Sequence, residues 1–152
     1  MAKTIEVKDL KAHEGEHLGA SDWHQVTQDQ VNLFADATGD HQWIHVDVER
    51  AKDGPFGGPI AHGYLTLSLL IPLWSQILVI EELDMAVNYG LNKVRFPSPV
   101  PAGARVRVTA ALAGAEEVNG GGIQATIDTV MHLGGADKPV CIAQMVHRYY
   151  KG

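Results

Sequence analysis

The sequence of 152 residues contains one cysteine, Cys141, so no disulfide bond can form within the chain. It also lacks clustered charge: the net charge is −6 at pH 7, and no run of Lys and Arg offers a surface for nucleic acid phosphates. No stretch near the N-terminus has the apolar core of a signal peptide. We therefore expect a cytoplasmic protein that binds no nucleic acid, with Cys141 buried as a small hydrophobic residue.

A long uninterrupted hydrophobic run is absent as well. The longest apolar segment, Tyr64 to Ile80, is broken by polar residues and by Pro72, which argues against a membrane span and favours a core helix over residues 63–80. Because proline removes a helical hydrogen bond, that helix is either bent or divided in two, with Pro72 in the first turn of the second part. The length and the 45% hydrophobic content predict a single domain over residues 1–152.

The other segments predict an α+β fold. Thr27 is a helix N-cap with Gln30 at the reciprocal position, and Gly39 ends that helix. Residues 40–62 have no regular pattern. Alternation of apolar and polar residues predicts strands, in addition to a short first strand at 22–26, over residues 86–96, 104–115, 122–133 and 139–150. We expect a four-stranded antiparallel meander wrapped around the helix, with edge strands that favour a dimer.

Two residues in the segment TGDHQWIHVDVERA (38–51) carry acid–base chemistry. Asp40 follows the end of a helix, where the helix dipole does not favour a carboxylate, and His45 lies five residues later. Such a pair can address one water molecule, and the backbone N–H of Gly63, at the start of the core helix, can bind an anionic oxygen. The ordinary alternatives are that Asp40 forms a turn and that His45 is a core histidine.

A metal site is the other kind of functional site that histidines in this segment could form. His41 and His45 are four residues apart, which would suit a metal ion on one face of a helix. The flanking sequence is not helical in pattern, and no third ligand follows nearby. We therefore expect no metal.

Two separated motifs resemble a known family. TGDHQWIHVDVERA followed by GGPIAHGYLTLSLL, together with NYGLNKVRFPSPVPAGARV (88–106), resembles the MaoC-like dehydratases, also called (R)-specific enoyl-CoA hydratases, and within them the nodulation-protein-N-like branch. The resemblance covers nearly all of the chain after residue 20. It implies a hot-dog fold, in which an antiparallel sheet wraps a long central helix, and a homodimer.

The resemblance also implies an activity: syn hydration of a trans-2-enoyl-CoA to the (R)-3-hydroxyacyl-CoA, without a metal or redox cofactor. Asp40 and His45 match the catalytic pair of the family, and Gly63 matches the glycine that binds the thioester oxygen. The chain departs from the family where Gln42-Trp43 replace a frequent Asn-Pro. It departs again at Ile71, where a serine that orients the aspartate is common. Ser68 and Asn88 are the candidates to replace that serine.

Several further residues are candidates for the substrate pocket, each with an ordinary alternative. Trp43 and Tyr64 line an acyl pocket or fill the core. His62 contacts the ligand or packs at the helix entry, and Asn88 faces a pocket or bonds to the backbone. The acyl chain length and the carrier, coenzyme A or a carrier protein, stay open.

Two other functions fit the same fold. A hot-dog acyl-CoA thioesterase usually has an Asp or Glu early in the helix, whereas residues 63–80 contain neither. A non-catalytic acyl-thioester-binding subunit would lose the pair that Asp40 and His45 form. The sequence therefore favours the hydratase.

Overall fold

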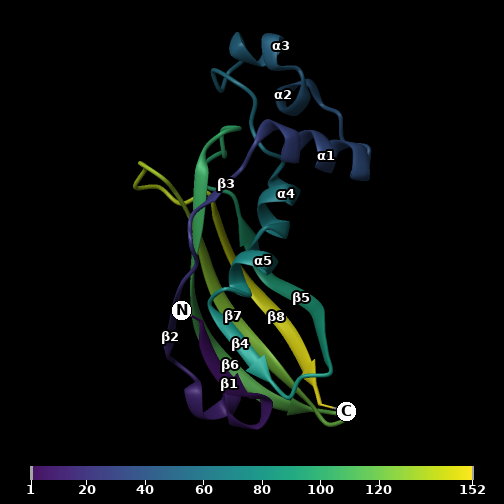
Figure 1. Cartoon of the computed structure of the whole chain (residues 1–152), viewed down its shortest axis with the longest axis vertical. Helices are drawn as coiled ribbons and strands as arrows, with labels where there is room; N and C mark the ends of the chain where they lie inside the picture. Colours follow the sequence, from purple (N-terminus) through teal and green to yellow (C-terminus); the bar gives the residue numbers. More distant parts are fainter. Residues whose placement is uncertain (1, 152) are drawn as a thin grey trace.

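The computed structural model describes residues 2–151 and is built around one antiparallel sheet (Figure 1). The strands follow the order β2-β6-β7-β8-β5, and the short β3 also pairs with β6. Their bounds are β2 His17–Ala20, β3 His24–Gln25, β5 Met85–Arg95, β6 Arg105–Val118, β7 Gly122–Leu133 and β8 Cys141–Tyr150. The four strands predicted after the helix are thus confirmed to within a few residues.

The predicted four-stranded meander is wrong in one connection. Strands β6, β7 and β8 form a meander, but β5 pairs antiparallel with β8, with Asn88 opposite His147, and has no pairing with β6. The segment FPSPVPAG (96–103) therefore crosses from one side of the sheet to the other. This arrangement leaves β5 as an edge strand.

The elements before residue 22 escaped prediction. Strand β1 (Lys3–Glu6) pairs in parallel with β4 (Leu78–Glu81), a 3-10 helix η1 (Val7–His13) follows, and β2 then joins the main sheet. The predicted first strand at 22–26 is reduced to the two residues of β3. Short strands of this kind are stabilised by partners that are distant in sequence, so local periodicity does not reveal them.

Helix α1 (Gln28–Thr38) begins and ends as predicted. The Thr27 side chain accepts a hydrogen bond from the Gln30 N–H at 3.1 Å, and Gly39 adopts the left-handed conformation with φ of 84°. The reciprocal bond is missing, because the Gln30 side chain pairs with His24 instead. Residues 40–62, expected to be irregular, contain α2 (Trp43–Val46) and α3 (Val48–Lys52), and His45 lies in α2.

The central helix is interrupted, as the second alternative for Pro72 predicts. It consists of α4 (Gly63–Ser68) and α5 (Leu70–Trp74), and residues 78–81 become β4 instead of extending the helix. The interruption falls at Leu69, next to Ser68. In a continuous helix the N–H of residue 72 would donate to the Ser68 carbonyl, but proline has no N–H. Pro72 itself lies in the first turn of α5, where its missing N–H costs little.

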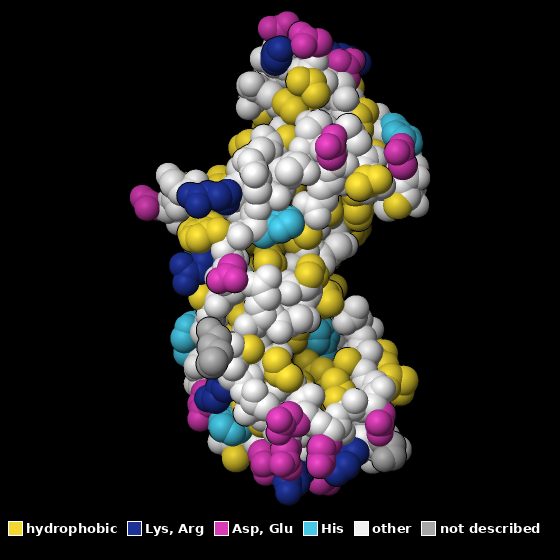
Figure 2. Space-filling model, viewed as in Figure 1, with side chains coloured by type: hydrophobic (Ala, Val, Ile, Leu, Met, Phe, Trp, Pro, Cys, Tyr) yellow, Lys and Arg dark blue, Asp and Glu magenta, His cyan; other side chains and the backbone are white. Residues whose placement is uncertain are grey.

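The core lies between this broken helix and the concave face of the sheet (Figure 1). Alternate residues of the three meander strands face the helix, and the buried set includes Leu65, Leu70, Leu73, Trp74, Val106, Val108, Leu112, Ile127, Met131 and Met145. A central helix wrapped by an antiparallel sheet is the hot-dog fold, so the predicted fold class is confirmed. Between α5 and β5 the cover is incomplete, and Figure 2 shows a hollow there.

Two further expectations concern the burial of Cys141 and the lack of a membrane span. Cys141 is fully buried, and burial raises the pKa of its thiol to about 11, so it is an unreactive hydrophobic residue as expected. No helix within residues 2–151 has the length and apolar character that a membrane crossing requires.

Candidate active site

Asp40 is placed by the end of α1. The left-handed turn at Gly39 brings the chain out of the helix, and the Asp40 N–H donates to the Thr38 hydroxyl at 3.4 Å. The Asp40 carboxylate is exposed and, within residues 2–151, accepts only one long hydrogen bond, from the Gln42 N–H at 3.4 Å. A carboxylate held this loosely keeps its lone pairs available for water or substrate.

His45 is fixed in a single orientation. Its side chain is buried, with 6% of its surface exposed, and its Nδ1 lies 2.6 Å from the carbonyl oxygen of Ile60. A carbonyl only accepts, so Nδ1 carries the proton and Nε2 presents a lone pair. The α2 backbone is held from two sides: the Ile60 N–H donates to the Ile44 carbonyl, and the Gln28 amide donates to the His45 carbonyl at 2.8 Å.

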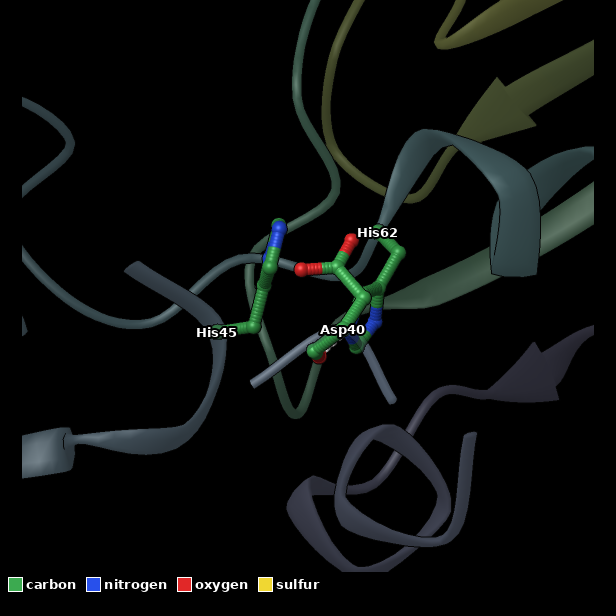
Figure 3. A group of neighbouring side chains, drawn as sticks. All are labelled: Asp40, His45 and His62. Atoms are coloured by element: carbon green, nitrogen blue, oxygen red, sulfur yellow. Dashed lines mark hydrogen bonds between the residues drawn. The ribbon is translucent and has the colours of Figure 1, made fainter. Parts of the chain in front are cut away.

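His62 joins these two residues. Its Nε2–H donates to the backbone carbonyl of Asp40 at 2.9 Å, and its ring stacks on His45 with 3.9 Å between ring centroids. Figure 3 shows the Asp40 carboxylate turned toward the His45 ring, with His62 behind both. His62 is almost fully buried, at 2% exposure, so it supports the pair from the protein side instead of facing solvent.

The three side chains also qualify as possible metal ligands, because one donor atom from each lies within 4.8 Å of the others. The pair weighed from sequence was His41 and His45, whereas the fold groups His45 with Asp40 and His62 and leaves His41 out. However, His45 Nδ1 and His62 Nε2 are occupied by carbonyls, and the two rings are stacked at 25°. The free nitrogen lone pairs of His45 and His62 lie in the planes of their rings. In two stacked rings these lone pairs point in nearly parallel directions, so they do not readily meet at one metal ion. Absence of a metal stays our prediction.

Gly63 opens α4 next to His62, and its N–H has no hydrogen-bond acceptor among the described residues. It borders a cleft of about 290 Å³ with Thr66, Phe96 and Val100. A Cβ at Gly63 would lie 3.4 Å from the Phe96 ring, so any larger residue would crowd that ring. The structure thus brings Asp40, His45 and Gly63 to one end of the molecule, where His62 contacts the first two and directly precedes Gly63.

The remaining candidate residues lie elsewhere. Trp43 packs against Gly54 and under the Arg50 guanidinium, which is 4.2 Å from its ring centroid. Tyr64 is 74% exposed. Ser68 donates to the Tyr64 carbonyl and shares a different cavity with Asn88, so neither contacts Asp40.

Asp40 is held by hydrogen bonds to His62 and Thr38, and not by Ser68 or Asn88. Neither hydrogen bond was predicted from the sequence. Thr38 stands two residues before Asp40, which is a common spacing for side chain to backbone bonds. His62 is twenty-two residues away, and only the fold brings it to Asp40.

We expect His45 to titrate below the ordinary histidine pKa of 6.5. Burial lowers its pKa most and the neighbouring His62 lowers it further, while the Ile60 carbonyl and the Asp40 charge raise it. Its contribution to the free energy of unfolding is therefore complete above about pH 6.5 and is lost as the pH falls toward the folded-state pKa. NMR titration of the His45 ring protons, identified by their absence in His45→Gln, measures this.

The same titration in Asp40→Asn is the control. The pKa of His45 should fall further, because the negative charge that raises it is gone. A midpoint at or above 6.5 in the unmodified protein, or a rise in Asp40→Asn, would contradict the geometry described for the pair.

Comparison with known proteins gives the family of the chain. Residues 9–132 match the family profile described as MaoC like domain. The chain is 56% identical to 3-hydroxyacyl-thioester dehydratase Z of Mycobacterium tuberculosis, over 94% of this chain and 95% of that protein. It is 41% identical to Nodulation protein N of Rhizobium leguminosarum bv. viciae, over 93% and 89%.

A solved structure titled as a monoamine oxidase regulatory protein from Archaeoglobus fulgidus superimposes with a TM-score of 0.80 at 25% identity, covering 100% of this chain and 99% of that one. The resemblance expected from the two sequence motifs is thus confirmed. The chain belongs to the MaoC-like dehydratase family and is an enzyme of that class.

Proposed function

We propose that the protein adds water to trans-2-enoyl thioesters to give (R)-3-hydroxyacyl thioesters, and catalyses the reverse dehydration. The observation that carries this proposal is the His45 imidazole, whose Nδ1–H is held by the Ile60 carbonyl and whose ring has a nitrogen within 4.8 Å of an Asp40 carboxylate oxygen. The 56% identical relative named 3-hydroxyacyl-thioester dehydratase Z supports the substrate class.

The pair presents two acceptors to one water molecule, His45 Nε2 and an Asp40 carboxylate oxygen. As the water oxygen bonds to C3 of the enoyl thioester, one of the pair takes a proton from it, and the pair returns a proton to C2. Both additions come from one side of the substrate, which makes the addition syn. General acid–base catalysis of this type contributes roughly 10²–10⁴-fold.

Negative charge develops on the thioester oxygen during this addition. The Gly63 N–H, which has no acceptor within the described residues, is the donor that we assign to it. One such donor contributes on the order of 10²–10³-fold. The reaction consumes only water and substrate, so we propose that it needs no cofactor and that coenzyme A enters as part of the substrate.

The thioesterase alternative uses the same fold but directs water at the carbonyl carbon. Neither α4 nor α5 contains an Asp or Glu, so no carboxylate lies along the helix for that chemistry. A purely binding subunit has no use for a histidine whose tautomer is fixed beside a carboxylate.

Incubation with crotonyl-CoA distinguishes the three functions. Loss of the conjugated enoyl absorbance without thiol release, giving the (R)-3-hydroxy product, is the expected result. Thiol release would indicate a thioesterase. Absence of both, also with longer enoyl chains and carrier-protein thioesters, would leave a binding protein and overturn the proposal.

We also propose that the active form is a homodimer paired through β5. Residues 85–92 of this edge strand contain no charge and no proline, the features that usually protect an exposed edge. Met85, Val87, Tyr89 and Leu91 are 52%, 37%, 59% and 46% exposed. A second copy fits this edge because two identical strands can pair antiparallel about a twofold axis.

We expect Val87→Lys to convert the dimer to monomer at micromolar concentration, because each copy would then bury a lysine charge in an apolar interface. Light scattering coupled to gel filtration measures the mass. Val79→Lys is the matched control, since Val79 is 45% exposed on β4, which pairs with β1 and is not part of the proposed interface, and should leave the mass unchanged. A monomeric unmodified protein, or an unchanged Val87→Lys dimer, would rule out this interface.

A further inference from the structure

A second cavity lies on the helix-facing side of the sheet, between α4–α5 and β5–β8. It consists of two adjoining hollows of about 350 and 260 Å³ that share Ile71, Asn88 and His147. The other walls are mainly apolar: Leu67, Leu70, Leu91, Met145, Trp74, Leu78, Ile80, Leu83. Figure 2 shows hydrophobic side chains and a histidine around the hollow. Asp40 and His45 are not among its walls.

Helix α4 connects this cavity to the candidate active site. Gly63, at its first residue, borders the cleft beside His62, and Ser68, at its last residue, borders the cavity. Five residues of helix span roughly 8 Å. An acyl chain that follows α4 from a thioester oxygen at the Gly63 N–H is then long enough to reach the cavity with its distal part.

His147 is a buried histidine in the wall of both hollows; it is 5% exposed and faces the helix side of β8. Its Nδ1 lies 3.0 Å from the Tyr149 hydroxyl, and the Trp74 indole is the other polar neighbour of that hydroxyl. A phenol both accepts and donates, so Tyr149 can accept from the indole and give its own proton to His147 Nδ1. With Tyr149 as that donor, the proton of the neutral His147 ring sits on Nε2.

This Nε2–H has no acceptor among the residues that the structure describes, and the ring lines both hollows. Burial lowers the pKa of His147, so the ring is uncharged at neutral pH. Burial raises the pKa of Tyr149 to about 12, which keeps the phenol protonated as the donor. A neutral N–H donor in an apolar wall suits a neutral oxygen acceptor better than a plain alkyl chain.

We propose that this cavity receives the distal acyl chain and that His147 selects chains carrying a neutral oxygen, such as a keto or hydroxyl group, over plain alkyl chains. Here the substrate class rests on the proposed function, since it assumes a thioester at Gly63. His147 is then a specificity-determining residue, held in one tautomer by Tyr149 and Trp74.

Calorimetric binding of two saturated acyl-CoA molecules of equal, medium length, one with a distal keto group, tests the proposal without requiring turnover. The protein should bind the keto form roughly 10- to 100-fold more tightly, since an alkyl chain leaves the N–H unpaired. His147→Phe should abolish this preference. His132→Phe, which replaces an outward-facing β7 histidine bonded to Thr109, should retain it.

Equal affinities in the unmodified protein, or a preference that survives in His147→Phe, would overturn the proposal. If His147→Phe does not fold, nitrogen NMR of the unmodified protein determines the tautomer of His147. The proposal requires a protonated Nε2 and an unprotonated Nδ1, and the opposite tautomer would overturn it. Crotonyl-CoA turnover is measured separately. A protein that discriminates the two ligands but does not hydrate crotonyl-CoA would refute the proposed reaction and not the cavity.

Discussion

Asp40→Asn and His45→Gln should each lower kcat/KM for crotonyl-CoA hydration by at least ~10²-fold, the lower part of the range for acid–base catalysis. Asparagine cannot take a proton from water, and glutamine lacks the Nε2 lone pair that the Ile60 carbonyl turns toward Asp40. Initial rates of enoyl absorbance loss measure the effect. Both variants should remain folded dimers, because Asp40 is exposed and the α2 backbone bonds do not involve the His45 ring.

Asp36→Asn and His41→Gln are the matched controls. They make the same chemical changes a few residues away, at side chains that are 73% and 55% exposed, and should turn over at the unmodified rate. Turnover by Asp40→Asn or His45→Gln within a few-fold of the unmodified protein would show that the pair is not catalytic. An equal loss in the controls would show a general effect of charge.

His62→Leu is expected to reduce kcat by roughly 10- to 100-fold with a smaller change in KM, because displacing a catalytic group by about 1 Å has an effect of that size. The substitution removes both the hydrogen bond to the Asp40 carbonyl and the stack against His45. Steady-state kinetics with crotonyl-CoA separate kcat from KM. We place His62 as a positioning residue, since it is buried behind the pair.

The titration of His45 gives a second readout that loss of packing alone would not produce. His62 lowers the pKa of His45, so His62→Leu should raise the NMR midpoint. Thr66→Val is the control: it removes a buried hydroxyl bonded to the His62 carbonyl but leaves the ring in place. An unshifted midpoint, or the same kinetic loss in Thr66→Val, would contradict the positioning role.

Local signals in the sequence were sufficient for much of the fold. Thr27 and Gly39 form the two ends of α1 through hydrogen bonds to nearby residues. The alternation of apolar and polar residues in 122–133 correctly predicted β7. These features depend on residues close in the chain, so periodicity and capping rules reach them. The partner of β5 did not follow, because sheet order is set by contacts between distant segments.

The candidate site divides in the same way. Asp40, His45 and Gly63 were proposed from two motifs, and the fold brings them to one end of the molecule. The supporting contacts escaped prediction, since His62 reaches Asp40 only when residues 60–62 return across α2. His147 escaped as well: the last strand was predicted without assigning its faces, and nothing in the sequence revealed the bond of His147 to Tyr149.

The break at Leu69 places part of the cavity wall on a second helix, which a continuous helix would fix rigidly to Gly63. Gly63 belongs to α4, whereas Ile71, which borders both hollows of the cavity, belongs to α5. Substitutions that tilt or refill α5 can therefore reshape the cavity while the backbone at Gly63 stays in register with Asp40 and His45. Such a scaffold lets a lineage, or a protein engineer, diversify substrate range around unchanged reaction chemistry.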